Sequence, residues 1–241
     1  MHRGYFYIKK HYQEPMQVLY EDNHIIIVSK TVNEIVQGDK TGDKTLIDTV
    51  KQYIKEKYAK PGDVFLGLTH RLDRPTSGVV IFAKTSKALS RLNAMFRDGE
   101  IHKTYWAITS NCPKETEGTL ENFIKKNEKL NKSFIAPAET KEAKKAILNY
   151  RIISKSDRYY LWEINLLTGR HHQIRCQLAA INCPIKGDLK YGYPRSNPDG
   201  GLSLHARKVE FIHPVSKKEI SVIAPVPEGD KLWKYFEQQT Q

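Results

Sequence analysis

Two short runs of apolar, largely β-branched residues do most to limit the folds open to this chain. They cover residues 25–29 and residues 79–83. A continuous apolar run of this length is typical of a strand that is buried on both faces of a sheet. We therefore expect a central sheet that other elements cover on both sides.

Weaker strand patterns follow at residues 159–166 and 202–211, and the second contains stretches of alternating apolar and polar residues. A polar turn at residues 156–158 separates residues 150–154 from the strand after it, which predicts a hairpin. Lysines dominate residues 125–145. We expect this stretch to be an exposed basic excursion between strands, either a plain solvated loop or a segment that faces RNA.

Helix signals are interspersed with the strands. Thr45 followed by Asp48 forms a capping-box pattern, and apolar residues at helical spacing then predict a helix up to about Tyr58. Three more helices are predicted, from Ser86 to a stop at Gly99, from near Thr168 through Ile181, and over residues 230–238. Strands and helices that mix without strict alternation indicate an α+β fold, with a mixed, largely antiparallel central sheet and flanking helices.

Length and charge narrow the class of protein. A chain of 241 residues with 39% hydrophobic residues is large enough to bury a core, so a globular enzyme is physically reasonable. Lys and Arg outnumber Asp and Glu by 39 to 27, and the resulting positive field attracts polyanions. This charge favours nucleic acid as a partner, although a lysine-rich solvated surface produces the same counts.

Cysteine usage and hydropathy indicate the compartment. Cys112, Cys176 and Cys183 are too few and too irregularly spaced for a disulfide scaffold, so we expect reduced thiols. No apolar run approaches the roughly 20 residues that span a bilayer. The first twelve residues lack the apolar stretch of a secretory signal. We expect a soluble cytoplasmic protein that does not enter a membrane.

Residues 69–78, Thr-His-Arg-Leu-Asp-Arg-Pro-Thr-Ser-Gly, carry the most chemical information. They place Asp73 between Arg71 and Arg74 and end in turn-forming residues ahead of a buried strand. Neighbouring guanidinium groups favour the charged form of a carboxylate, and a desolvated carboxylate that stays ionised is a competent nucleophile. A structural ion pair explains the same pattern, and the spacing alone favours that simpler interpretation.

Residues 70–78 resemble the H-R-L-D-x-x-T-S-G signature of RluA-type RNA pseudouridine synthases. Further similarity follows in the family's order at Tyr105, at residues 168–175 and around Leu204. The remaining matches are residues 20–22, Lys30, residues 184–188, residues 191–192 and residues 213–214. The chain departs from the family pattern at three positions, with Thr31 in place of proline, His171 in place of threonine and Gln177 in place of histidine.

The resemblance implies the pseudouridine synthase fold and a reaction without metal, nucleotide or redox cofactor. It extends over nearly the whole chain from about Val18 onward. We therefore expect a single catalytic domain over residues 1–241, with a core at about 18–236 and an N-terminal extension at 1–17. We expect no separate N-terminal RNA-binding domain and a monomeric enzyme.

In this family a uracil base is detached from its ribose, rotated and rejoined through a ring carbon. The resemblance implies that Asp73 attacks the glycosidic carbon or assists elimination there, and the sequence leaves both courses open. Arg175 matches the family arginine that pairs with the catalytic aspartate, and a guanidinium fork suits that task. Tyr105 matches the tyrosine that lies against the target base, and it is also a candidate general base.

A stacked uridine cannot present its glycosidic bond to Asp73, so the enzyme must extrude it at a cost of roughly a few kcal/mol. Arg71 resembles the arginine that fills the vacated space, and Leu204 resembles the apolar floor beneath the base. The other expected substrate-binding residues are His70, Arg170, Gln173 and Lys30. The expected substrate is ribosomal or transfer RNA, with phosphates contacted by lysines such as Lys125, Lys126, Lys144 and Lys145.

Two other functions compete with this interpretation. A non-catalytic RNA-binding protein would use the same basic charge, but it has no reason to place Asp73 where phosphate approaches.

A zinc enzyme is suggested by nine histidines. Adjacent His171 and His172 point in different directions on a helix, and no H-E-x-x-H or C-x-x-C pattern is present. Since these patterns argue against a zinc site, we expect His70 and His205 to be structural groups.

Overall fold

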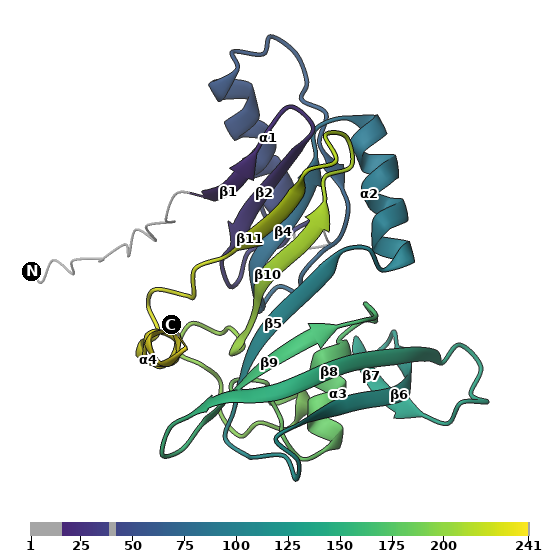
Figure 1. Ribbon diagram of the computed structural model, residues 1–241, viewed down its shortest axis with the longest axis vertical. Helices are drawn as coiled ribbons and strands as arrows, with labels where there is room; N and C mark the ends of the chain where they lie inside the picture. The colour runs from purple at the N-terminus through teal and green to yellow at the C-terminus, as the bar shows by residue number, and fades with distance from the viewer. Residues whose placement is uncertain (1–15, 39–41, 241) are drawn as a thin grey trace, which may run out of the picture.

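The computed structural model of the chain describes residues 16–38 and 42–240. The predicted N-terminal extension, residues 1–17, therefore lies outside the described residues except for its last two positions. In the described part, eleven strands form one sheet, accompanied by four α-helices and one short 3-10 helix (Figure 1).

The elements follow one another without strict alternation. The strands are β1 (Gln17–Glu21), β2 (Ile25–Lys30), β3 (Gly67–Leu68), β4 (Ser77–Ala83), β5 (His102–Thr109), β6 (Glu117–Asn127), β7 (Lys132–Ala136), β8 (Lys144–Lys155), β9 (Tyr160–Leu166), β10 (Leu204–Ile212) and β11 (Glu219–Ile223). The helices are α1 (Leu46–Lys57), α2 (Ser86–Asp98), α3 (Gln173–Ala180), the 3-10 helix η1 (Leu189–Tyr191) and α4 (Lys231–Gln239).

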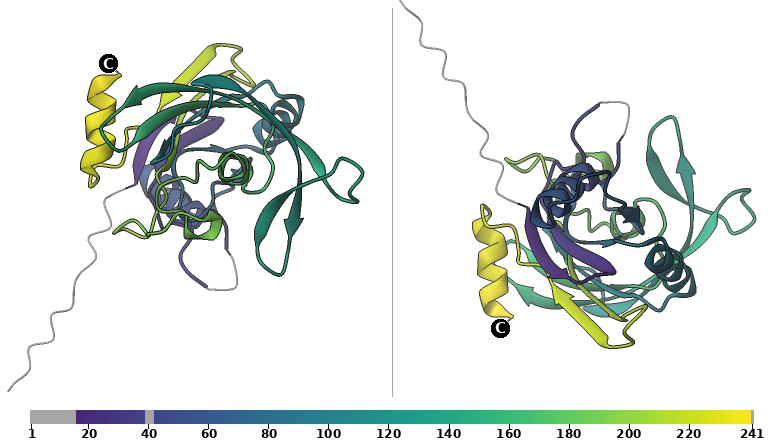
Figure 2. Two further views of the ribbon diagram at one scale, coloured as in Figure 1. Left: turned by 90° about the horizontal axis from the view of Figure 1, so that it is seen from below. Right: turned by 90° about the horizontal axis from the view of Figure 1, so that it is seen from above.

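The strands pair along the path β1-β2-β4-β10-β5-β9-β8-β6-β7, while β11 joins β10 and β3 joins β4. Only β4 and β10 run parallel among the described pairs, and all the others are antiparallel. The predicted α+β class with a mixed, largely antiparallel sheet is thereby confirmed. Figure 2 shows the sheet strongly curved, with α3 on its concave side.

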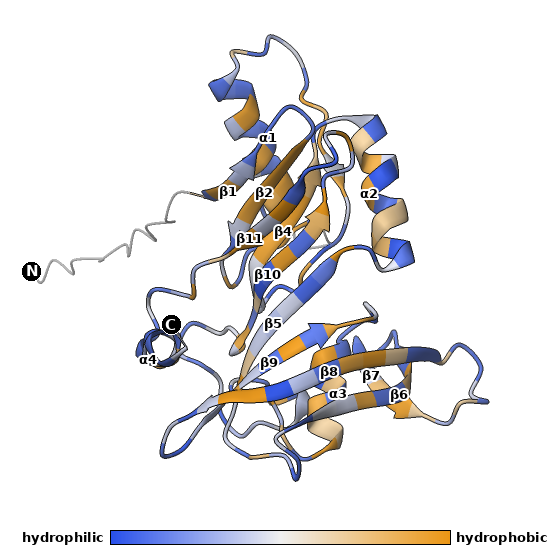
Figure 3. Cartoon of the chain, viewed as in Figure 1, coloured by the Kyte–Doolittle hydropathy of each residue, from blue (hydrophilic) through white to orange (hydrophobic). Residues whose placement is uncertain are grey.

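The two apolar runs of the sequence form β2 and β4, which pair at the centre of the upper half of the sheet. Both strands are buried on both faces, as predicted, and they stand out as continuously hydrophobic in Figure 3. Ile26 and Phe82 pack with α1 on one face, whereas Ile27 and Ile81 pack with α2 on the other. This double burial fixes the strand that follows the Asp73 segment.

Local signals placed two of the helix ends correctly. The side chain of Thr45 accepts from the backbone N–H of Asp48, and the Asp48 side chain accepts from the backbone of Thr45, so the predicted capping box is confirmed. Gly99 ends α2 in the left-handed conformation, with φ of 77°. Strands β9 and β10 and helix α4 lie within two residues of the predicted bounds.

Two expectations were wrong. Helix α3 begins at Gln173 and not near Thr168, because His172 adopts a left-handed backbone and the Gln173 side chain accepts from the backbone N–H of Arg170. The lysine-rich residues 125–145 are not an excursion between strands. They contain the end of β6, all of β7 and the start of β8, because the outer face of an edge hairpin tolerates lysines (Figure 1).

Gly78 permits the parallel pairing of β4 with β10. Its φ is +114°, and a Cβ added there would lie 2.3 Å from the carbonyl oxygen of Ala206 and 2.6 Å from the Ala206 nitrogen. We expect Gly78→Ala to lower the free energy of unfolding, measured in urea, by about 3 kcal/mol or more, because backbone must move.

Gly99→Ala is the matched control for this substitution. Gly99 also has a positive φ, of +77°, but a Cβ there meets nothing within 4 Å. We expect this control to cost only about 1 kcal/mol, the ordinary penalty for a left-handed non-glycine residue. Equal losses in the two variants would contradict a role for the close contact with Ala206.

Candidate active site

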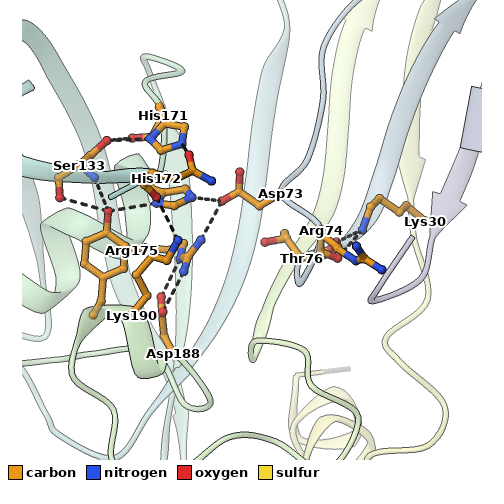
Figure 4. A network of polar contacts seen from close by, with 12 residues as sticks. Lys30, Asp73, Arg74, Thr76, Ser133, His171, His172, Arg175, Asp188 and Lys190 are labelled. Atoms are coloured by element: carbon orange, nitrogen blue, oxygen red, sulfur yellow. Dashed lines mark hydrogen bonds and ion pairs between the residues drawn. The ribbon is translucent and has the colours of Figure 1, made fainter. Parts of the chain in front are cut away.

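The loop between β3 and β4 carries Asp73, and Lys30 holds this loop from behind. The side chain of Lys30 is almost fully buried, and burial lowers its pKa to about 7. Its Nζ donates to three main-chain carbonyl oxygens, those of Thr31 (2.9 Å), Arg74 (3.0 Å) and Thr76 (2.6 Å). Figure 4 shows Lys30 on the opposite side of the loop from the Asp73 carboxylate. Lys30 therefore positions the loop.

Arg175 on α3 is the cation that faces Asp73. Its Nη1 lies 3.1 Å from Asp73 Oδ2. Its Nε and Nη2 donate to the two carboxylate oxygens of Asp188, at 2.7 and 2.9 Å. Burial opposes the charge of Arg175, but the Asp188 and Asp73 carboxylates outweigh it and raise the pKa of Arg175. The guanidinium is thus fixed by a bidentate pair and presents an Nη1 N–H to Asp73.

His172 is a second neighbour of Asp73. Its Nε2 lies 3.4 Å from Asp73 Oδ2, and its Nδ1 lies 3.1 Å from the hydroxyl of Tyr191. Burial and the nearby charge of Arg175 lower the pKa of His172 to about 2, so the ring is neutral. Its neighbour His171 stacks on it with ring centroids 3.8 Å apart. The expectation that these two histidines point in different directions on a helix was wrong, because both precede α3.

A pocket of about 240 Å³ opens in front of Asp73. Tyr105 from β5 and Leu204 from β10 supply apolar surface, while the Asp73 side chain remains 33% exposed. Burial raises the pKa of Tyr105. The phenol is therefore protonated at neutral pH. The arrangement combines an accessible carboxylate, a fixed guanidinium and an aromatic wall.

Seven of the nine predicted site residues line this pocket, namely Asp73, Tyr105, Arg175, Arg71, Leu204, Arg170 and Gln173. Two of these seven also hold the wall itself, because Arg170 Nε donates to the Lys145 carbonyl and Gln173 Nε2 donates to the Ile147 carbonyl. Lys30 and His70 do not line the pocket.

Arg74 does not act as the sequence suggested. It lies 3.2 Å from Asp43 in an exposed ion pair, turned away from Asp73. The charge that faces Asp73 comes instead from Arg175, which is 102 positions further along the chain. Arg71 is exposed and makes no ion pair within the part of the chain that the structure describes.

The structure places His70 against the sheet. Its Nε2 accepts from the backbone N–H of Ile81 at 3.0 Å, and its ring packs on Phe96. Burial lowers the pKa of His70 to about 3. His205 is held similarly, with Nδ1 2.8 Å from the hydroxyl of Ser77 and a pKa lowered to about 4 by burial.

Sequence reasoning assigned no role to Asp188, Tyr191 or His172. The Gly-Asp and Tyr-Gly pairs at residues 187–188 and 191–192 were recognised as similar to the family pattern. That similarity was the available signal, but it did not indicate the partners. Asp188 pairs with Arg175 only because η1 packs against α3.

Residues 16–38 and 42–240 contain no group of three or more His, Cys, Asp or Glu side chains that could hold a metal ion. Within the same ranges, no helix is long and apolar enough to cross a membrane.

Comparison with solved structures defines the class of fold. The chain is similar to human RNA Pseudouridylate Synthase Domain Containing 4, with a TM-score of 0.77 and 22% identity over 93% of this chain and 92% of that one. It is similar to human RNA Pseudouridylate Synthase Domain Containing 1, with a TM-score of 0.69 and 22% identity over 88% of this chain and 84% of that one. At such identities the likeness concerns the fold.

Sequence comparison is more specific. Residues 24–180 match the model of the RNA pseudouridylate synthase family. The chain is 32% identical to an uncharacterized RNA pseudouridine synthase of Synechocystis sp., over 93% of this chain and 70% of the relative. It is 30% identical to ribosomal large subunit pseudouridine synthase D of Zymomonas mobilis (90% and 71%) and 32% identical to tRNA pseudouridine synthase C of Vibrio vulnificus (91% and 93%).

The chain therefore belongs to the RNA pseudouridylate synthase family, as an RluA-type isomerase that converts uridine to pseudouridine in RNA. The resemblance stated from residues 70–78 is confirmed. The alternative of a non-catalytic RNA-binding protein loses its support.

The bidentate pair with Asp188 leads to a prediction about activity. Asp188→Asn removes a buried negative charge that fixes Arg175, so the guanidinium no longer presents Nη1 to Asp73 in one direction. We expect the single-turnover rate of pseudouridine formation to fall by about 10²-fold, the cost of a small misplacement in an active site.

Asp43→Asn is the control, because it removes the exposed partner of Arg74. An exposed pair contributes little, so we expect a rate within about twofold of the wild type. Equal rates for the Asp188→Asn and Asp43→Asn variants would contradict the role of Asp188.

Burial of neutral His70 leads to a prediction about stability. In the folded chain the pKa of His70 is about 3, whereas the pKa of an unfolded histidine is about 6.5. Below about pH 6.5 the unfolded chain therefore binds more protons. The free energy of unfolding should decrease from there downward, by up to about 1.4 kcal/mol per pH unit for this group.

Urea unfolding of the wild type and of His70→Gln, from about pH 7 to about pH 4.5, measures this effect. We expect a shallower decrease in the variant. Identical pH slopes would show that His70 is not held neutral in the fold.

Proposed function

We propose that Asp73 acts on the glycosidic carbon of a uridine extruded into the 240 Å³ pocket. The observation that carries this proposal is the 3.1 Å contact between Arg175 Nη1 and Asp73 Oδ2. It holds the carboxylate in one direction while leaving a third of the side chain exposed.

In the nucleophilic course, an Asp73 oxygen bonds to the ribose C1′ while the bond from C1′ to uracil N1 breaks, and its electron pair stays on the base. The base rotates, its C5 bonds to C1′, and the Asp73 oxygen leaves with its electron pair. The C5 proton is then lost and N1 gains a proton, so the net change is an isomerisation. In the elimination course Asp73 takes the ribose C2′ proton while the bond from C1′ to N1 breaks, and it returns that proton to C2′ when C5 bonds to C1′; the C5 proton is again lost and N1 gains one. Both courses require an ionised carboxylate.

The base has a defined place in this proposal. Uracil lies against the Tyr105 ring, with Leu204 beneath it, because an aromatic face stacks on any base. Since the Tyr105 phenol stays protonated at neutral pH, we assign it a stacking role and no role as a base. Arg71, which is exposed at the pocket, fills the space that the extruded base leaves.

The substrate follows from charge and from the relatives. A net charge of +12 favours a large polyanion, and relatives are named for the ribosomal large subunit and for tRNA. We propose ribosomal or transfer RNA as the substrate. We further propose that the chain works in the cytoplasm as a monomer with one catalytic domain. We also propose that the reaction uses no metal or cofactor, since the described residues already supply charge, positioning and stacking.

Asp73→Asn tests the proposal in cells and in vitro. We expect the variant to form no product, because an amide neither attacks C1′ nor accepts the ribose proton. Its affinity for RNA should equal or exceed that of the wild type, because a negative charge is removed. Mapping pseudouridine in total RNA from cells that carry the wild type, the variant or no copy of the gene measures product and locates the target.

Asp157→Asn, at the exposed turn between β8 and β9, is the control for the change in charge. It should restore every pseudouridine that the wild type restores. Product formed by the Asp73→Asn variant would reject the proposed chemistry.

A further inference from the structure

A second cavity, of about 410 Å³, adjoins the catalytic pocket of about 240 Å³. The two share their walls at Arg71, Leu72, Asp73, His171, His172 and Arg175. Beyond this shared boundary the second cavity is lined by residues 35–38, Arg74 and Pro75, and by Lys126, Asn131 and Lys190, which we call its far wall. Asp73 therefore stands where the two cavities meet.

The cavities differ in chemistry. The catalytic pocket has Tyr105, Ile174 and Leu204, which suit a base. The second cavity instead adds cationic side chains, with Lys126 and Lys190 at its far wall. In a nucleotide the base and the phosphates lie on opposite sides of the ribose. With the ribose at Asp73 and the base against Tyr105, the backbone leaves toward the second cavity.

The far wall of the second cavity is held in place. Asn131 Oδ1 lies 3.1 Å from His171 Nε2, and the Asn131 carbonyl accepts from Lys190 Nζ at 3.1 Å. His171 Nδ1 lies 2.9 Å from the hydroxyl of Ser133 on β7. His171, which stands where the family has threonine, thus ties the turn between β6 and β7 to the boundary of the active site.

The two lysines retain charge for a ligand. Lys190 donates to a neutral carbonyl and makes no ion pair among the described residues. Lys126 lies 2.6 Å from Glu128, but the Glu128 side chain is 79% exposed. A water-exposed pair of this kind is weak, so a phosphate can replace Glu128 as the partner.

We propose that this second cavity binds the sugar and phosphate of the nucleotide adjoining the target uridine, with the phosphate between Lys126 and Lys190. The inference rests on the proposed function, since it takes the ribose of the target to lie at Asp73. The two lysines are binding residues and not catalytic residues, because they lie on the wall away from the reacting bond.

The test uses the purified full chain and a stem-loop RNA that contains the uridine located by mapping. We expect Lys126→Gln with Lys190→Gln to raise KM and Kd by roughly tenfold, while kcat stays within about twofold. The slope of log Kd against log salt should become shallower by about one, because fewer counterions are released. Lys217→Gln with Lys218→Gln removes the same charge at the exposed turn between β10 and β11 and should change Kd by less than about threefold.

A second arm replaces each of the two phosphates that flank the target uridine, one at a time, by a neutral methylphosphonate. In the wild type one replacement should weaken binding, and in the Lys126→Gln, Lys190→Gln variant the same replacement should have no further effect. Equal weakening by both lysine pairs, or an undiminished methylphosphonate effect in the variant, overturns the subsite. A wild type that forms no pseudouridine rejects the proposed function instead.

Discussion

The contact of one guanidinium with two carboxylates organises this site. Asp188 takes two N–H groups of Arg175, which leaves Nη1 as the donor that faces Asp73. A buried cation without partners would be too costly to keep, and an unpaired Arg175 would be free to turn. The two carboxylates therefore balance the charge of the buried Arg175 side chain, and the contact with Nη1 sets the direction of the accessible Asp73 carboxylate.

The fold brings the partners of this contact together from distant parts of the chain. Asp73 lies on the loop before β4, and Lys30 at the end of β2 fixes that loop through two of its carbonyl oxygens, those of Arg74 and Thr76. Parallel pairing of β4 with β10 sets Leu204 beside the same loop, and Tyr105 comes from the neighbouring β5. The central strands are buried on both faces, so they form a rigid base for the loop.

Sequence alone predicted the strands and helix ends that depend on interactions between neighbouring residues. The β-branched runs gave β2 and β4, the Thr45 and Asp48 pair gave the start of α1, and Gly99 gave the end of α2. It failed where tertiary contacts decide, as at the start of α3 and in the lysine-rich hairpin. It identified the RNA pseudouridine synthase family from residues 70–78, but it could not show that Lys30 lies behind the loop or that Asp188 fixes Arg175, because those contacts join distant segments.

The most direct measurement compares the single-turnover rates of Arg175→Lys and Arg175→Met in folded protein. If the Arg175 guanidinium holds Asp73 in one direction, the Arg175→Lys variant should retain a small part of the rate and the Arg175→Met variant essentially none, with RNA affinity little changed in both. Methionine at position 175 with a rate near that of the wild type would contradict the account, because Asp73 would then act without its partner.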